Sequence, residues 1–255
     1  MSARKLYIIT GASRGLGAAM AGLLIGPTHH LVCMARSALP DLQRRALAAG
    51  CALDARRVDL SDIPAAVRTL EESLSGIDPD VVSEAWLINN AGTVLPVRPA
   101  DQTQPAEIVA GVAVNLAAPM ALTAAFLRLT ANWPERCQRK VVNVTSGAAH
   151  KPYQGWSVYC ATKAALDQFT RCVALEQQDL PRGARIASLA PGLMDTEMQA
   201  VIRNLPPGDF KEQPRFLAAK QSGQLVAPEA AARRLIAYIE SSDFGMEPVV
   251  DLRHH

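Results

Sequence analysis

A glycine-rich turn near the start of the chain constrains its fold more than any other feature. The apolar run Leu6–Thr10 leads into TGASRGLG at 10–17, and a stretch with helical spacing, Gly15–Ile25, follows at once. Glycine between a strand and a helix lets the backbone approach a pyrophosphate group and presents the amides of the helix N-terminus to its charge. The turn therefore predicts a strand, a nucleotide-binding turn and a helix, although its glycine spacing differs from G-x-G-x-x-G.

Apolar runs alternate with helical stretches along the rest of the chain. The runs have no strict period of two, which indicates strands covered on both faces and hence a parallel sheet. We expect an α/β fold, with residues 1–255 forming a single domain built as a doubly wound parallel sheet with helices on both faces. The expected strands are Leu6–Thr10, Leu31–Ala35, Ala55–Leu60, Ala85–Asn89, Val141–Ser146, Ile186–Ala190 and Pro248–Leu252, and the expected long helices are Gly15–Ile25, Pro105–Thr130 and Val158–Gln177.

The alternation breaks down between 193 and 226. Pro206, Pro207, Gly208 and Pro214 interrupt any helical or strand period there. We expect an irregular substrate-loop lobe or lid over about 193–226, because loops of this kind often carry binding functions. The residues expected to line it are Leu193, Met194 and Met198.

Composition excludes several classes of protein. The 26 Lys and Arg residues nearly balance the 24 Asp and Glu residues, and no run of five basic residues occurs, so a nucleic-acid partner is not expected. The five cysteines form no Cys-x-x-Cys pair, and the five histidines show no metal-ligand spacing, so we expect buried free thiols and no metal.

Two apolar segments raise the question of a membrane. The stretch Leu6–Ile9 is too short for the core of a signal peptide, and a cytoplasmic location is expected. No side chain from Ile108 to Leu127 carries a formal charge, but Asn115 and Pro119 interrupt this run. We expect a buried helix there, with no membrane association.

The end of the second expected strand indicates which nucleotide the turn accepts. An enzyme that uses NAD usually has Asp or Glu there to hold the ribose 2′-hydroxyl. This chain has Arg36 and Ser37 at that place, no acidic residue before Asp41, and Arg14 inside the glycine turn. Two guanidinium groups without a carboxylate suit a 2′-phosphate, because arginine offers planar, multidentate donors. We expect NADPH rather than NADH, the alternative being that both arginines are simply solvated.

Four further residues form a candidate catalytic set. Tyr159 and Lys163 are four residues apart on an expected helix, so their side chains leave one face of it about 5 to 6 Å apart. The ammonium of Lys163 would favour the phenolate form of Tyr159. Ser146, at a strand end, has a hydroxyl that can hydrogen-bond a carbonyl oxygen as charge develops there. Asn115 is an amide in an apolar helix that needs partners, and a water-linked chain to Lys163 is one use for it.

Together these residues resemble the short-chain dehydrogenase/reductase family over nearly the whole chain, through TGASRGLG, Asp59-Leu60, NNAG at 89–92, Asn115, Ser146, Tyr159-x-x-x-Lys163 and Pro191-Gly192. The resemblance implies a Rossmann-type sheet of about seven parallel strands and hydride transfer between nicotinamide C4 and a carbonyl or carbinol carbon. It implies that Tyr159 is the general acid in reduction and that Lys163 lowers its pKa and holds the nicotinamide ribose. Ser146 would steady the substrate oxygen and Asn115 would anchor a proton relay.

The same resemblance implies a set of cofactor-binding residues, among which Asp59 would hydrogen-bond the adenine. The set is Gly11, Ser13, Arg14, Gly15, Leu16, Gly17, Arg36, Ser37, Asp59, Leu60, Asn90, Ala91, Gly92, Tyr159, Lys163, Pro191, Gly192 and Thr196.

A narrower similarity is to the sepiapterin reductases and the related benzil reductases of that family. It rests on GWSVYCATKAALD at 155–167, APGLMDTEM at 190–198, SGQLV at 222–226 and VVDLR at 249–253. It implies three substrate-binding residues, namely Ser146, Trp156 as an apolar wall, and Asp251 as a carboxylate for the amino-pyrimidine end of a pterin. For Trp156 the alternative is a core residue, and for Asp251 a structural hydrogen bond or a surface strand residue.

The expected function is that of an NADPH-dependent carbonyl reductase that acts on a small molecule, either a sepiapterin-like pterin or an aryl 1,2-diketone. The alternatives are an NADP-dependent secondary-alcohol dehydrogenase and a redox-sensing module that binds NADPH without chemistry. The long, nearly uncharged helix around 106–127 and the helix that starts near 158 would bury well between subunits, and the family resemblance implies a homodimer or homotetramer.

Overall fold

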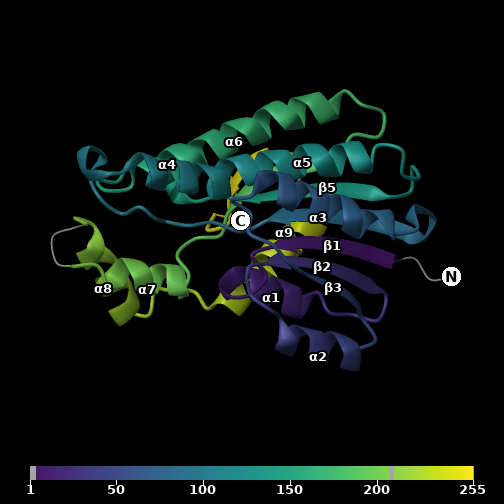
Figure 1. Cartoon of the computed structure of the whole chain (residues 1–255), viewed down its shortest axis with the longest axis horizontal. Helices are drawn as coiled ribbons and strands as arrows, with labels where there is room; N and C mark the ends of the chain where they lie inside the picture. Colours follow the sequence, from purple (N-terminus) through teal and green to yellow (C-terminus); the bar gives the residue numbers. More distant parts are fainter. Residues whose placement is uncertain (1–3, 207–209, 255) are drawn as a thin grey trace.

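Seven parallel strands form one sheet within residues 4–206 and 210–254, which the computed structural model describes (Figure 1). Their order is β3-β2-β1-β4-β5-β6-β7, so the chain builds outward from β1 on one side and then returns to build on the other. The expected sheet is therefore confirmed. The strands are β1 (Arg4–Thr10), β2 (His29–Ala35), β3 (Ala52–Arg57), β4 (Val82–Asn89), β5 (Gln138–Val144), β6 (Arg185–Ala190) and β7 (Val249–Asp251).

Helices cover both faces of the sheet, as the fully apolar strand pattern requires. The α-helices are α1 (Gly15–Leu23), α2 (Pro40–Ala48), α3 (Ile63–Ser75), α4 (Pro105–Val112), α5 (Ala118–Leu129), α6 (Ser157–Gln178), α7 (Glu197–Arg203), α8 (Gln213–Gln221) and α9 (Pro228–Glu240). One buried cluster joins α1, α2 and α9 to the sheet through residues such as Met20, Leu42 and Leu235. A second cluster joins α3, α5 and α6 to the opposite face through residues such as Leu70 and Leu122.

Some expected boundaries differ in the structure. The strand expected at Ala55–Leu60 lies earlier, at Ala52–Arg57, so Asp59 and Leu60 belong to the loop that follows it. Strand β5 ends at Val144, which leaves Ser146 in the following loop, as the N-cap of a 3₁₀ turn. Parallel pairing ends at these positions because the chain must turn there toward the next helix.

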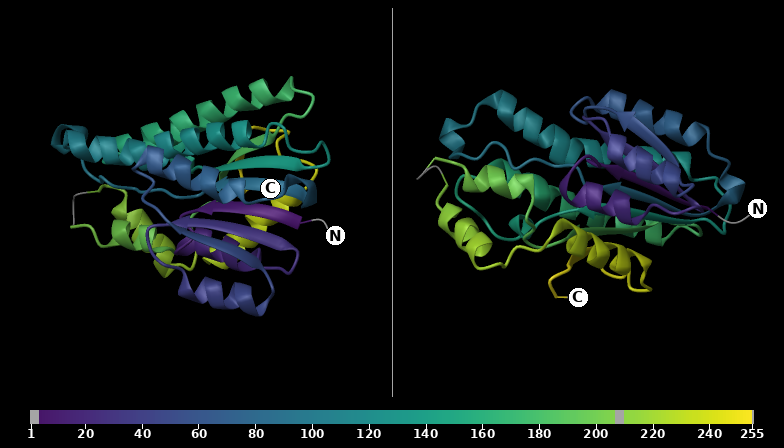
Figure 2. Two further views of the ribbon diagram at one scale, coloured as in Figure 1. Left: turned by 45° about the vertical axis from the view of Figure 1, so that its right-hand side comes forward. Right: turned by 90° about the horizontal axis from the view of Figure 1, so that it is seen from below.

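The segment expected as an irregular lobe contains two helices, α7 and α8, which lie beyond the carboxyl ends of the strands in Figures 1 and 2. Its base is closed by a bridge between Met194 and Val226, in which Asp195 N donates to Val226 O at 2.9 Å and Val226 N donates to Leu193 O at 3.0 Å. The expected span of 193–226 thus corresponds to a unit of structure, but the two helices within it are regular. Pro207 and Gly208 lie outside the described residues.

The long helical region expected at 105–130 is interrupted by a π-helical turn, Ala113–Ala117, between α4 and α5. Among the described helices, Pro105–Leu129 alone is long and apolar enough to cross a membrane by length and composition. Its α5 portion packs on the sheet through Leu122 and Phe126, as expected for a core helix, whereas Ile108 and Val109 of α4 are exposed.

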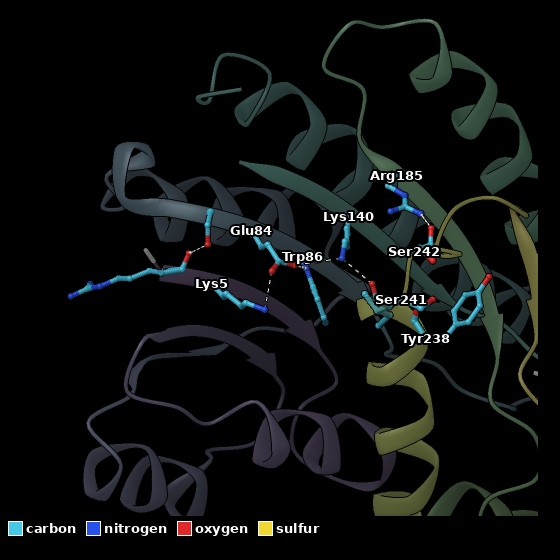
Figure 3. A network of polar contacts seen from close by, with 11 residues as sticks. Lys5, Glu84, Trp86, Lys140, Arg185, Tyr238, Ser241 and Ser242 are labelled. Atoms are coloured by element: carbon cyan, nitrogen blue, oxygen red, sulfur yellow. Dashed lines mark hydrogen bonds and ion pairs between the residues drawn. The ribbon is translucent and has the colours of Figure 1, made fainter. Parts of the chain in front are cut away.

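A polar network ties the amino ends of three strands together (Figure 3). Lys140 of β5 is 4% exposed, and its Nζ donates to Ile239 O of α9 at 2.9 Å and lies 3.5 Å from Glu84 Oε2 of β4. Glu84 also pairs with Lys5 of β1 at 2.8 Å and accepts from Trp86 Nε1 at 3.0 Å. Burial alone would raise the pKa of Glu84, but the hydrogen bond and charge of Lys5 and the charge of Lys140 lower it. Glu84 therefore remains a carboxylate, which compensates the buried ammonium.

The cysteines only partly match expectation. Cys33, Cys51 and Cys137 are buried free thiols, whereas Cys160 is half-buried and Cys172 is exposed. Both exceptions lie on α6, whose outer side is not covered by the sheet. Burial raises the pKa of Cys33 to about 12, which keeps that thiol protonated.

Candidate active site

The turn between β1 and α1 is built on close backbone approach. Gly11 and Gly15 have φ values of +69° and +54°, in the left-handed region that favours glycine. A Cβ at Gly17 would overlap the carbonyl oxygen of Gly11, and because both are backbone positions in a packed turn, neither can move aside. The three glycines are therefore required by geometry, and they leave the start of α1 open to an anionic ligand. Leu16 anchors this start in the core.

Side chains at the end of β1 fasten the turn to the end of β4. Thr10 Oγ1 accepts from Asn90 N at 3.0 Å and from Ala91 N at 3.1 Å, and Asn90 Nδ2 donates to Thr10 O at 2.9 Å. A Cβ at Gly11 would lie 3.0 Å from Ala91 Cα. The structure thus brings the expected segment Asn90 to Gly92 against the glycine turn, at the point where the strand order reverses and α/β proteins bind their ligands.

A shallow pocket lies at the ends of β2 and β3, lined by Arg36, Arg57, Val58 and Asp59. Arg57 Nε donates to Arg36 O at 3.1 Å, so two guanidinium groups share this pocket. Hydrogen bonds from Ser61 lower the pKa of Asp59, despite slight burial, and the charge of Arg36 adds to the effect. Ser37 is exposed beside the pocket. Leu60 is 7% exposed and packs in the core, so its side chain does not line the pocket.

The other arginine that was expected at the 2′-phosphate, Arg14, has a different partner. Its guanidinium forms an ion pair with Glu197 at the start of α7. Thr196, directly before Glu197, also packs against the turn. A Cβ added at Gly15 would lie 3.4 Å from Thr196 Cγ2. Arg57 thus joins Arg36 at the pocket, while Arg14 connects the turn to the lobe; the expected binding of a 2′-phosphate by Arg14 and Arg36 stays a prediction.

Three of the four expected catalytic side chains form one group at the start of α6. The Ser146 hydroxyl hydrogen-bonds the Tyr159 phenol, and Ser146 Oγ accepts from Ala148 N at 3.2 Å. Lys163 Nζ lies 5.9 Å from the centre of the Tyr159 ring and donates to Val144 O at 2.8 Å. The i, i+4 spacing on α6 and the end of β5 thus combine to assemble the expected group.

Asn115, the fourth residue, sits in the π-helical turn and is 1% exposed. Its Oδ1 accepts from Thr93 N at 2.8 Å, and its Nδ2 donates to Thr93 O at 2.8 Å and to Thr162 Oγ1 at 3.3 Å. A Cβ at Gly92 would meet both Asn115 Oδ1, at 3.3 Å, and Lys163 Nζ, at 3.7 Å. The side-chain amide of Asn115 therefore holds the loop after β4 beside Lys163, through its two hydrogen bonds to the backbone of Thr93.

Burial controls the proton affinity of this group. It raises the pKa of the Tyr159 phenol, and the Ser146 hydrogen bond only partly offsets the effect. It also lowers the pKa of Lys163 to about 8, against the opposing charge of Asp167. Desolvation thus dominates the pKa of the Tyr159 phenol, and the expectation that Lys163 lowers this pKa stays a prediction. Tyr159 is protonated at physiological pH and is able to act as an acid.

An aromatic cluster adjoins Tyr159. The ring centre of Trp156 lies 5.2 Å from that of Tyr159, 4.7 Å from Phe210 and 5.5 Å from Phe216. Leu193 and Met198 of the lobe pack against this cluster, as expected, but Met194 packs against the sheet core instead. Trp156 is thus an apolar wall beside the phenol, and the lobe supplies the two phenylalanines that face it.

Asp251 lies at the carboxyl end of β7, where its carboxylate is held by Arg253. Arg253 Nε lies 2.9 Å from Oδ1 and 3.0 Å from Oδ2. Hydrogen bonding to Arg253 lowers the pKa of Asp251, against partial burial. The side chain of Arg253 borders Gly192, whose φ of +87° requires glycine, and Gly147 beside Ser146. Pro191, before Gly192, is buried at the end of β6.

Several functional candidates were missed by sequence reasoning. Arg253 directly follows an expected strand, so the rule that ligands bind at the carboxyl ends of strands could have found it, whereas Arg57 ends only the observed strand β3. Phe210 and Phe216 gave no signal, because only the folding of the lobe brings them to Trp156. Asp167, which is 1% exposed and accepts from Ser188 Oγ at 2.6 Å, stands one helical turn beyond Lys163.

The donor set fits a nicotinamide dinucleotide. The tight turn that needs Gly17, the amides at the start of α1 and the guanidinium groups of Arg36 and Arg57 match the phosphate groups of such a cofactor. Ser146, Tyr159 and Lys163 stand at the carboxyl end of β5, on the other side of the switch point. The fold and site define a Rossmann-type oxidoreductase.

Comparison with known proteins identifies the family. The short chain dehydrogenase family profile matches residues 5–205, and the chain belongs to this family of oxidoreductases that bind a nicotinamide cofactor. It is 37% identical to a benzil reductase ((S)-benzoin forming) of Bacillus cereus, covering 96% of this chain and 98% of that one. It is 32% identical to the sepiapterin reductase of Xenopus tropicalis, covering 94% and 92%. The crystal structure of the KRED1-Pglu enzyme superposes with a TM-score of 0.78 at 29% identity, covering 96% and 100%.

The buried lysine makes activity dependent on pH. Lys163, with a pKa of about 8, is charged below that pH and neutral above it, so turnover should fall on the alkaline side. Asp167 is the charge that raises this pKa. Asp167→Asn should therefore move the alkaline limb of the kcat profile to lower pH by about one unit. The matched control is Asp179→Asn at the exposed end of the same helix, which should leave the profile unchanged. Coincident profiles for wild type and Asp167→Asn would contradict this coupling.

Proposed function

We propose that the protein is an NADPH-dependent reductase of aryl 1,2-dicarbonyl compounds. The observation that carries this proposal is the set of aromatic rings beside the proton-donating phenol, with Trp156 against Tyr159 and with Phe210 and Phe216 from the lobe against Trp156. Rings of this kind bind aryl groups by offset and edge-to-face contact. The printed activity of the benzil reductase relative supports the same substrate class.

A pterin substrate is less well supported by the site. Its amino-pyrimidine end would need a free carboxylate, and Asp251 is the residue expected to supply one. Both oxygens of Asp251 are within 3.0 Å of Arg253 Nε, and breaking this bidentate pair would cost the ligand binding energy. The pairing of Asp251 with Arg253 therefore favours the aryl dicarbonyl over the pterin that the sepiapterin reductase resemblance implies.

The proposed chemistry divides the work between coenzyme and protein. When bound, the nicotinamide supplies a hydride to the carbonyl carbon. Tyr159 donates its phenolic proton to the carbonyl oxygen, so the carbonyl gains one hydride and one proton and becomes an alcohol. The Ser146 hydroxyl stabilises the charge that develops on that oxygen. The Lys163 ammonium stabilises the phenolate that remains until a proton from solvent restores the phenol.

The test of this function is the initial rate of NADPH oxidation with benzil, sepiapterin and a simple aliphatic ketone. We expect turnover with benzil to exceed that with the other two. Tyr159→Phe should bind NADPH as wild type does but lose turnover by roughly 10²- to 10⁴-fold, because it lacks the acid. Preference for sepiapterin would indicate the pterin reductase instead. Tight NADPH binding without turnover would indicate a sensor, and activity only with alcohols and NADP⁺ a dehydrogenase.

Coenzyme choice is attributed to the pocket of Arg36 and Arg57. Arg36→Ala and Arg57→Ala should each raise KM for NADPH about tenfold, because each removes charge-assisted hydrogen bonds to the 2′-phosphate. KM for NADH should change little. Arg44→Ala, which removes an exposed arginine paired with Asp41 on α2, is the matched control and should change neither constant. Equal losses with both coenzymes would show that the pocket does not read the 2′-phosphate.

We propose further that a second copy of the chain covers the outer side of α4 and α5. Val109 is 67% exposed, and Ile108 and Met120 are 40% and 38% exposed, on a run without formal charge. Burial of such a surface favours a helix-to-helix interface. Sedimentation should give a species larger than 27.3 kDa, and Val109→Asp should shift it to the monomer. Leu47→Asp, at an 83% exposed site on α2, should have no effect. A wild-type monomer would contradict the interface.

A further inference from the structure

The indole N–H of Trp156 is a buried donor without an acceptor. The residue is 4% exposed, and its Nε1 has no hydrogen-bond partner among the described residues. An indole nitrogen can only donate, and the rigid ring cannot turn its N–H away as a hydroxyl can. Folded proteins pair nearly all buried donors, because leaving one unpaired costs about 1–3 kcal/mol. This N–H therefore calls for an acceptor that the protein itself does not provide.

The surroundings of Trp156 contain little that could serve as that acceptor. Its ring neighbours are Tyr153, Tyr159, Phe210 and Phe216, at centroid separations of 4.7 to 5.5 Å. The rest of the buried cluster consists of Val94, Val97, Ala148 and Ile202. The hydroxyl of Tyr153 accepts from Arg215 at 3.1 Å, and that of Tyr159 is engaged with Ser146. The ring of Trp156 thus packs among aromatic and aliphatic side chains, and a hydrogen bond from its N–H to an entering ligand is strong in such a setting.

The position of Trp156 relates it to the reacting group. It stands three residues before Tyr159, at the N-cap of α6, and its ring packs against the phenol. A carbonyl group placed to receive the Tyr159 proton would therefore lie close to the indole ring. In a 1,2-dicarbonyl the second oxygen is on the adjacent carbon, and it needs a donor when the aryl groups are buried. A mono-ketone has no such oxygen.

We propose that the Trp156 N–H donates to the second, non-reacting carbonyl oxygen of the substrate and so selects 1,2-dicarbonyls over mono-ketones. This inference rests on the proposed reductase function and deepens it, because it assigns the substrate preference to one atom. Trp156 then has two tasks, since its ring contacts the aryl group while its N–H holds the second oxygen. Trp156 would then do more than form the apolar wall that the family resemblance implies.

The test compares two substrates that differ at one position. Benzil has two carbonyl groups between its phenyl rings, and 1,2-diphenylethanone has one carbonyl and one CH₂ in their place. Trp156→Phe keeps an aromatic ring and removes the N–H. We expect kcat/KM for benzil to fall about tenfold, the loss of one buried hydrogen bond. We expect kcat/KM for the mono-ketone to change less than twofold, so the ratio between the substrates falls.

The control separates the N–H from packing. Phe216→Leu changes another ring of the cluster that carries no donor, so it should lower kcat/KM for both substrates by the same factor and leave their ratio unchanged. Equal losses on both substrates in Trp156→Phe would overturn this inference alone. Failure of the wild-type protein to reduce either ketone would overturn the proposed function and this inference with it.

Discussion

The close approach of helix α1 to the turn after β1 is the constraint on which the rest of the site depends. Gly17 packs so tightly on the Gly11 carbonyl that no side chain fits between them, and Asn90 fills the remaining space. This packing fixes three things together, namely the direction of α1, the end of β4 and the open amides of the turn. The ends of β4 and β5 then present Gly92 and Ser146 on the other side of the same switch point. A larger residue at position 17 would therefore disturb both the nucleotide cradle and the alignment of the reacting groups.

Burial is the second determinant of the chemistry. Tyr159 and Lys163 are both withdrawn from water, and desolvation moves their pKa values in opposite directions, upward for the phenol and toward 8 for the ammonium. A phenol that keeps its proton suits the donation of that proton in a reduction. The ammonium needs support to stay charged at such a depth, and the carboxylate of Asp167 provides it from the same helix. The site thus combines the Tyr159 phenol, which keeps its proton, with the Lys163 ammonium, whose charge is supported by Asp167.

The sequence alone was sufficient to predict the sheet, the glycine turn and the placement of Tyr159 beside Lys163, because each follows from a local pattern, whereas the catalytic roles were implied by the family resemblance. Apolar runs mark the strands, glycine marks the turn, and the i, i+4 spacing of Tyr159 and Lys163 marks one face of a helix. The misses have a different origin. Arg57 was missed because β3, the strand that it ends, was placed three residues too late. Phe210 and Phe216 were missed because their contact with Trp156 exists only after the lobe has folded. The pKa of Tyr159 could not be predicted, because desolvation is a property of the packed structure and not of the spacing.

The bridge between Met194 and Val226 has a consequence for how proteins of this fold diverge in sequence. The two ends of the lobe, after β6 and before α9, lie side by side, and backbone hydrogen bonds join them there. The 31 residues from 195 to 225 therefore form an insertion whose two ends lie side by side. Length and composition of this insertion can change without altering the register of any strand or the spacing of the catalytic group. Proteins of this fold can in this way differ in the lobe that contacts the substrate while they keep the same reaction.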